Sequence, residues 1–130
     1  MRVESAVAAV QVLLIEDEAI IRLVTAEALQ DEGFEVIEAA DGDEAVKLLD
    51  GPGRFDVLFT DVRMPGALDG IGVALHARRR YPALPVIVTS GYAVNLIARL
   101  GVLDPSAILI AKPYNLGEVI EALRRLTSHL

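Results

Sequence analysis

Short apolar runs alternate with longer amphipathic stretches along the chain, and this alternation limits the possible folds more than any other feature of the sequence. Most of the runs are continuous rather than alternating in polarity, which is typical of parallel strands that are covered on both faces. The runs predict five strands, at residues 12–15, 35–39, 57–60, 86–89 and 107–110.

The amphipathic stretches predict five helices, at residues 18–31, from 41 onward, at 70–81, at 92–100, and from 115 almost to 130. Glycine or proline follows the first, third and fourth of them, as is usual where a helix ends. The second and fifth begin at the capping residues Asp41 and Asn115. Right-handed crossovers then predict an α/β fold, a doubly wound parallel sheet in the flavodoxin-like order 2-1-3-4-5.

Length and charge limit the domain count and the class of partner. A chain of 130 residues, 53% of them hydrophobic, can form one core but not two, so we expect one domain, at residues 11–130. Residues 1–10 are expected to be an arm or linker. The net charge of -7 disfavours direct binding to nucleic acid or to anionic membranes. The only basic run, from Arg78 to Arg80, is expected to be a solvated helix end.

Cysteine is absent, which excludes disulfides, thiolate catalysis and cysteine-based metal sites. The apolar stretch at residues 6–15 resembles a secretory signal only weakly, because acidic residues follow it in place of a small-residue cleavage site. No stretch approaches the ~18 apolar residues of a membrane span. These features predict a cytoplasmic protein that does not enter the membrane.

Polar side chains follow four of the five predicted strands. In sheets of this topology, ligands bind at the carboxyl ends of the strands, where the strand order reverses between the first and third strands. Glu16 and Asp17 follow the first strand, and Asp61 follows the third. Thr89 and Ser90 stand at the end of the fourth strand, and Lys112 follows the fifth. The sequence therefore predicts three carboxylates, a hydroxyl and an ammonium group at one edge.

Each of these residues has an ordinary structural alternative when it is taken singly. Asp17 could cap the first helix, Thr89 could be a common β-branched strand residue, and Lys112 could be a solvated loop lysine. Three clustered carboxylates without a cation would repel one another, however, so that one would have to hold its proton. A bound ion removes this repulsion, and oxygen ligands favour Mg²⁺. Zinc is a poor candidate because the chain has no cysteine and only two histidines, His76 and His129.

A metal ion beside these groups indicates phosphoryl chemistry on an aspartate. Asp61 could attack phosphorus as a nucleophile, while Mg²⁺ and Lys112 neutralise the equatorial oxygens and Thr89 donates a hydrogen bond. The product would be an aspartyl phosphate. No P-loop, nucleophile elbow or dinucleotide-binding glycine motif competes with this interpretation.

The same residues occur in a specific combination with proline, glycine and acidic neighbours: Glu16-Asp17, Asp61 with Met64-Pro65 and Asp69-Gly70, Thr89-Ser90, and Lys112-Pro113. With these motifs the chain resembles the receiver domain of two-component response regulators over about residues 10–130. The loop at residues 66–68 and the segment from Thr89 to Tyr92 are similar to a subset of receivers found as single-domain regulators and in hybrid histidine kinases.

The resemblance implies a role for each matching residue. Asp61 would accept the phosphoryl group from a histidine kinase or a histidine phosphotransfer protein. Glu16, Asp17, Asp61 and the main-chain carbonyl of Arg63 would hold Mg²⁺. Lys112 would pair with the phosphoryl oxygens, and its bond to Pro113 would be a cis peptide. Thr89, with the Ser90 amide, would sense the phosphoryl group and switch the face formed by helix 4, strand 5 and helix 5. The chain would thus be a phosphoacceptor regulator rather than an enzyme.

Two positions depart from the commonest receiver pattern. Many receivers carry Tyr or Phe three residues before the lysine, where this chain has Leu109, so the usual aromatic readout is not expected. Arg63, two residues after Asp61, is at a position that can shield the phosphoryl group, and we expect it to alter the lifetime of that group.

The predicted fourth helix has almost no polar face. We interpret it, with Leu109 and the last helix, as a partner or homodimer surface; a short irregular helix is the alternative.

Two other functions remain open at this point. The first is a phosphatase or phosphotransferase that uses Asp61 as a transient nucleophile. A D-x-D phosphatase would carry a second acid where this chain has Arg63. The second is a pseudo-receiver that is never phosphorylated, which the complete set of acidic, hydroxyl and lysine residues disfavours.

Overall fold

The computed structural model describes residues 9–64, 66, 68–91 and 107–128. The strands are β1 (Gln11–Ile15), β2 (Glu35–Ala39), β3 (Val57–Asp61), β4 (Val86–Ser90) and β5 (Ile108–Ala111). The helices within these ranges are α1 (Ala19–Asp31), α2 (Gly42–Asp50), α3 (Gly70–Arg80) and α5 (Leu116–Thr127). None of these helices is long and apolar enough to cross a bilayer. The predicted helix at residues 92–100 lies outside the described ranges.

The five strands form one parallel sheet in the order β2-β1-β3-β4-β5, so the predicted α/β fold and strand order are confirmed. Each observed strand begins and ends within one residue of its predicted bounds. The sheet register places Asp61 of β3 opposite Thr89 of β4. All five strands therefore end at the same edge of the sheet, where the predicted site residues lie.

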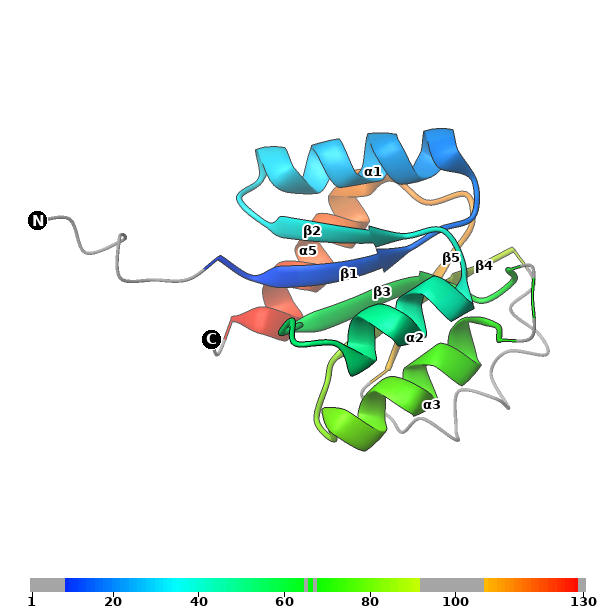
Figure 1. The fold of residues 1–130 in the computed structure, drawn as a ribbon. Helices are drawn as coiled ribbons and strands as arrows, with labels where there is room; N and C mark the ends of the chain where they lie inside the picture. The colour runs from blue at the N-terminus through cyan, green and yellow to red at the C-terminus, as the bar shows by residue number, and fades with distance from the viewer. Residues whose placement is uncertain (1–8, 65, 67, 92–106, 129–130) are drawn as a thin grey trace, which may run out of the picture.

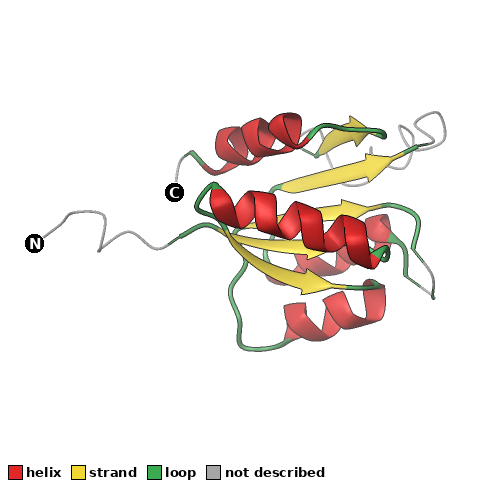
Figure 2. Ribbon diagram, turned by 90° about the horizontal axis from the view of Figure 1, so that it is seen from above, coloured by secondary structure: helices red, strands yellow, loops and turns green. Residues whose placement is uncertain are grey.

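Helices cover both faces of the sheet, as Figures 1 and 2 show. On one face, α1 and α5 contribute residues such as Leu29 and Leu123 to a core that includes Phe59. On the other face, α2 and α3 contribute residues such as Leu49 and Val73 to a second core. Because both faces of the central strands are buried in this way, their sequences are continuously apolar.

Two of the three arginines at the end of α3 bind main-chain carbonyls. The Arg80 guanidinium donates hydrogen bonds to the carbonyls of Leu49, at 2.6 Å, and Gly51. Arg78 Nε donates to the carbonyl of Leu84 at 3.1 Å. Arg79 and Arg80 are exposed, as expected for a solvated helix end, while Arg78 is partly buried. Arg78 and Arg80 also supply donors to carbonyls in the turn after α3 and at the end of α2.

The start of α3 is in close contact with the backbone that carries Asp61. Gly70 N donates to the carbonyl of Val62 at 2.9 Å, and the Asp69 side chain caps the helix by accepting from Gly72 N at 2.9 Å. A Cβ atom on residue 70 would lie 2.1 Å from the Asp61 carbonyl oxygen. Only glycine therefore allows α3 to begin at this distance from the end of β3.

A Gly70→Ala substitution is expected to lower the free energy of unfolding by about 1–3 kcal/mol, the usual cost of overpacking, because the Asp61 backbone must move. Urea unfolding measures this change. Gly53→Ala is the matched control, since a Cβ there would meet its nearest atom at 3.7 Å, an ordinary contact. Equal stability of the two variants would contradict the close approach.

Candidate functional site

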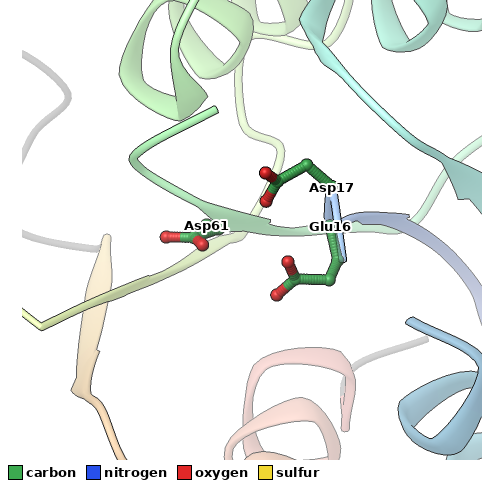
Figure 3. A group of neighbouring side chains, drawn as sticks. All are labelled: Glu16, Asp17 and Asp61. Atoms are coloured by element: carbon green, nitrogen blue, oxygen red, sulfur yellow. The ribbon is translucent and has the colours of Figure 1, made fainter. Parts of the chain in front are cut away.

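Three carboxylates from two neighbouring strands meet at the carboxyl edge of the sheet (Figure 3). Glu16 and Asp17 directly follow β1, and Asp61 is the last residue of β3. One carboxylate oxygen from each of the three lies within 4.8 Å of the others. Glu16 and Asp61 are buried while Asp17 is exposed, so the cluster has a protein side and a solvent side. The predicted convergence of the three acids is confirmed.

Lys112 contributes the positive charge of the site. Its Nζ lies 2.7 Å from Asp61 Oδ2 and 3.7 Å from Glu16 Oε1. The lysine main chain is held by a hydrogen bond from Lys112 N to the Ser90 carbonyl at 2.9 Å. The peptide bond to Pro113 is cis, as the sequence resemblance implies. Lys112 therefore faces the acids, and the alternative of a solvated loop lysine is wrong.

The Asp61 carboxylate is held by its own strand end as well as by Lys112. Arg63 N donates to Asp61 Oδ1 at 3.3 Å, and the Thr60 hydroxyl donates to the Asp61 carbonyl at 2.8 Å. Oδ1 and Oδ2 thus have different partners, a main-chain amide and an ammonium group. The carboxylate is oriented before any ligand binds, although the side chain of Arg63 itself is exposed.

Burial and charge act in opposite directions on the acids and the lysine. Burial raises the pKa of Glu16 above its ordinary value, while the Glu18 amide, which donates to Glu16 Oε2 at 3.0 Å, and the Lys112 charge partly oppose this rise. Burial alone would lower the pKa of Lys112, but its hydrogen bond and charge interaction with Asp61 outweigh burial and raise it. The site therefore favours the charged form of Lys112 and the protonated form of Glu16.

The arrangement fits a hard divalent cation. Three carboxylate groups within reach of one another supply oxygen ligands of the kind that Mg²⁺ prefers, and the exposed Asp17 opens one side of the cluster to water. A divalent ion would also compensate the negative charge that Lys112 alone does not balance. Glu16, Asp17 and Asp61 are the residues that could hold it.

Two hydroxyl residues end β4, and both are buried: Thr89 is 2% exposed and Ser90 is 3% exposed. Thr89 pairs with Asp61 in the sheet register and so shares its side of the sheet. Ser90 lies one residue nearer the carboxyl edge. Leu109, at the position where an aromatic residue is common, is partly buried and packs against the core formed with α2 and α3.

Two residues near the site were missed from the sequence. Arg22 of α1 donates to the Glu16 carbonyl at 2.8 Å, and the Tyr114 ring packs edge-on against Phe59 at 6.0 Å. Arg22 carries no motif signal, since an arginine in an amphipathic helix is usually a solvent-exposed residue. Tyr114 follows Lys112-Pro113 directly, and this adjacency was the only available signal.

An exposed apolar surface adjoins the acidic site. Four of the five large apolar side chains that are exposed in the described ranges belong to α1, and Ile20, Leu23 and Val24 are each more than half exposed. A cavity of about 660 Å³ lies between α1 and the segment after β5, lined by Glu18, Ile20, Ile21, Val24, Thr25, Lys112, Pro113, Tyr114 and Leu116. Lys112 lines this cavity and also contacts Asp61, so the cavity lies next to the acidic site.

A Lys112→Met substitution is expected to raise the pKa of Glu16 further, because it removes the charge that opposes burial. In the metal-free protein, a raised carboxyl pKa means that the folded state holds its proton to higher pH than the unfolded state does. Stability is then lost as the pH rises through the raised pKa. The variant should therefore lose more stability than the wild type between acidic and neutral pH.

Carbon-13 NMR titration of the glutamate carboxyl groups measures the Glu16 pKa directly. Lys47→Met is the matched control, since Lys47 in α2 is the only other lysine. It should leave the Glu16 pKa unchanged. The same Glu16 pKa in wild type and Lys112→Met would contradict the electrostatic coupling.

The sequence is similar to several signalling proteins that are much longer than this chain. It is 34% identical over 122 residues to a putative response regulator NtrX-like of Rickettsia bellii, which covers 89% of this chain and 24% of that protein. It is 34% identical over 116 residues to the sensor kinase CckA of Brucella abortus, covering 88% of this chain and 12% of the kinase. The chain thus spans a quarter or less of these two relatives.

The fold is similar to solved receiver structures over nearly its whole length. A response regulator receiver protein from Sinorhizobium medicae superposes with a TM-score of 0.85 at 34% identity, covering 92% of this chain and 95% of that one. The receiver domain of the hybrid histidine kinase CckA superposes with a TM-score of 0.76 at 32% identity, covering 90% and 98%. The family model described as the response regulator receiver domain matches residues 12–124. The chain therefore belongs to the response regulator receiver domain family.

Proposed function

We propose that this receiver domain accepts a phosphoryl group on Asp61 from a phosphohistidine of a histidine kinase or histidine phosphotransfer protein. The observation that carries the proposal is the position of Asp61: it lies in contact with the Lys112 ammonium at 2.7 Å and within 4.8 Å of two further carboxylates. A phosphoryl group on Asp61 would be surrounded by the only lysine in the described site and by acids suited to a divalent ion.

In the proposed reaction, an Asp61 carboxylate oxygen forms a bond to phosphorus while the bond from phosphorus to the donor imidazole nitrogen breaks. The imidazole leaves with the electron pair of that bond and takes up a proton. Lys112 neutralises negative charge on the phosphoryl oxygens, and the Arg63 amide holds the other Asp61 oxygen in place. Mg²⁺ bound by Glu16, Asp17, Asp61 and the Arg63 carbonyl would supply further charge neutralisation.

The proposed switch begins at β4. Thr89, with the Ser90 amide, would bind the phosphoryl oxygens and move the end of β4, and β5 is hydrogen bonded to this strand. The output surface would include β5, α5 and the predicted helix 4, which lies outside the described residues. This surface could bind a partner or form a homodimer.

A Thr89→Val variant that is phosphorylated and shows the same NMR shift changes in α5 as the wild type would contradict this role of Thr89.

The exposed apolar surface of α1 is the proposed docking site for the phosphodonor protein. Its cavity shares Lys112 with the acidic site, so a protein seated there would be next to Asp61. The acids around this surface, including Glu18 and Glu27, are exposed and would repel a second copy that carries the same charges. They favour a donor helix with an apolar ridge flanked by lysine or arginine.

Incubation with Mg²⁺ and a small phosphodonor such as acetyl phosphate is expected to add one phosphoryl group, stable in acid and labile in base, as measured by mass spectrometry of the intact protein. Asp61→Asn should abolish the adduct because the nucleophilic oxygen is lost. Removal of Mg²⁺ with EDTA should prevent its formation.

The same adduct, followed over time, tests Arg63. Loss of the phosphoryl group at equal rates in the wild type and in Arg63→Ala would contradict the proposed effect of Arg63 on the lifetime of the phosphoryl group. A turnover phosphatase would instead release phosphate steadily with no lasting adduct, and a pseudo-receiver would gain no adduct at all. Either result would overturn the proposed function.

A Val24→Asp substitution is expected to slow phosphoryl transfer from a purified phosphorylated histidine kinase or phosphotransfer protein by about tenfold, which corresponds to about 1.4 kcal/mol. Labelling by acetyl phosphate should not change, because Val24 is outside the acidic site. Leu75→Asp is the control, since Leu75 is an exposed apolar residue on α3. Equal slowing by both variants, or by neither, would contradict donor docking on α1.

A further inference from the structure

Arg22 binds the main chain of the acidic strand end rather than its carboxylates. From α1, its Nη1 donates to the Glu16 carbonyl at 2.8 Å, and its Nε lies 3.4 Å from Glu38 Oε1 of β2. The arginine side chain is 21% exposed, so both contacts are partly shielded from water. One guanidinium thus joins the helix after β1, the end of β1 and the neighbouring strand.

Arg22 contacts Glu16 through its main-chain carbonyl, whereas Lys112 Nζ lies 3.7 Å from the Glu16 carboxylate. The contact of Arg22 with this residue is geometric: it fixes the direction of the Glu16 carbonyl. That carbonyl belongs to the peptide group that joins Glu16 to Asp17, and the plane of a peptide group is rigid. On the other side of the residue, Glu16 N donates to the Ala39 carbonyl at 3.1 Å.

We infer that Arg22 is a positioning residue of the acidic site, which holds the peptide between Glu16 and Asp17 so that both carboxylates face Asp61. The inference rests on the proposed function, in which these acids hold Mg²⁺. Glu38 takes part by orienting the guanidinium, since Arg binds two partners through a planar fork that a lysine ammonium lacks. Without Arg22, the exposed Asp17 carboxylate would sample directions away from the other acids.

An electrostatic role and a positioning role of Arg22 predict opposite changes in Mg²⁺ affinity when Arg22 is removed. Loss of a nearby positive charge would by itself strengthen Mg²⁺ binding. Loss of a group that orients a metal ligand weakens binding, usually by tenfold or more. The sign of the change in Mg²⁺ affinity therefore separates a positioning role from a purely electrostatic one.

The experiment measures Mg²⁺ affinity by isothermal titration calorimetry for the wild type, Arg22→Met and Arg22→Lys. We expect about tenfold weaker binding for Arg22→Met, which keeps an unbranched apolar side chain, and clearly weaker binding for Arg22→Lys, which keeps the charge. Arg54→Met is the matched control, since Arg54 pairs with Asp56 at 3.4 Å before β3, away from the carboxyl edge. It should bind Mg²⁺ like the wild type.

A second measurement needs no metal. The carbonyl carbon-13 shift of Glu16 should change in Arg22→Met while the shift of Asp61 stays the same, and thermal unfolding should confirm that the variant folds. Unchanged or tighter Mg²⁺ binding by a folded Arg22→Met would overturn the inference. Failure of the proposed function has a different signature, namely a wild type that binds no Mg²⁺ or gains no adduct on Asp61.

Discussion

The contact between the Lys112 ammonium and the Asp61 carboxylate is the interaction on which the rest of the site depends. Without it, three carboxylates within 4.8 Å would repel one another at an edge where two of them are buried. One positive charge does not balance three negative ones. Burial raises the pKa of Glu16, and the neighbouring Asp17 and Asp61 add to this rise. The site is thus suited to bind a further cation.

The parallel sheet makes this contact possible between residues that are far apart in the sequence. Lys112 and Asp61 are separated by 51 positions, but β3, β4 and β5 lie side by side and end at the same edge. The Lys112 amide is bonded to the Ser90 carbonyl, and the Val62 amide to the Thr89 carbonyl. The strand between them therefore fixes the distance from the lysine to the aspartate through main-chain hydrogen bonds.

The fold and the acidic cluster could be predicted from the sequence because both depend on local patterns. A buried parallel strand is mostly apolar, and the first acidic residue at its carboxyl end marks the edge of the sheet, as Asp61 and Glu16 do. The contacts of Arg22, Arg78 and Arg80 could not be predicted in this way. A long side chain on a helix looks solvent-exposed in the sequence, and only the three-dimensional positions of nearby main-chain carbonyls decide which one it binds.

The close approach of Gly70 to Asp61 also limits how the segment between them can vary. The Gly70 amide returns to the Val62 carbonyl, so residues 62–70 form a closed loop whose two ends are bonded to each other. Changes at the two ends of the segment would displace the Asp61 carboxylate, so its junctions with β3 and α3 leave little freedom for substitution.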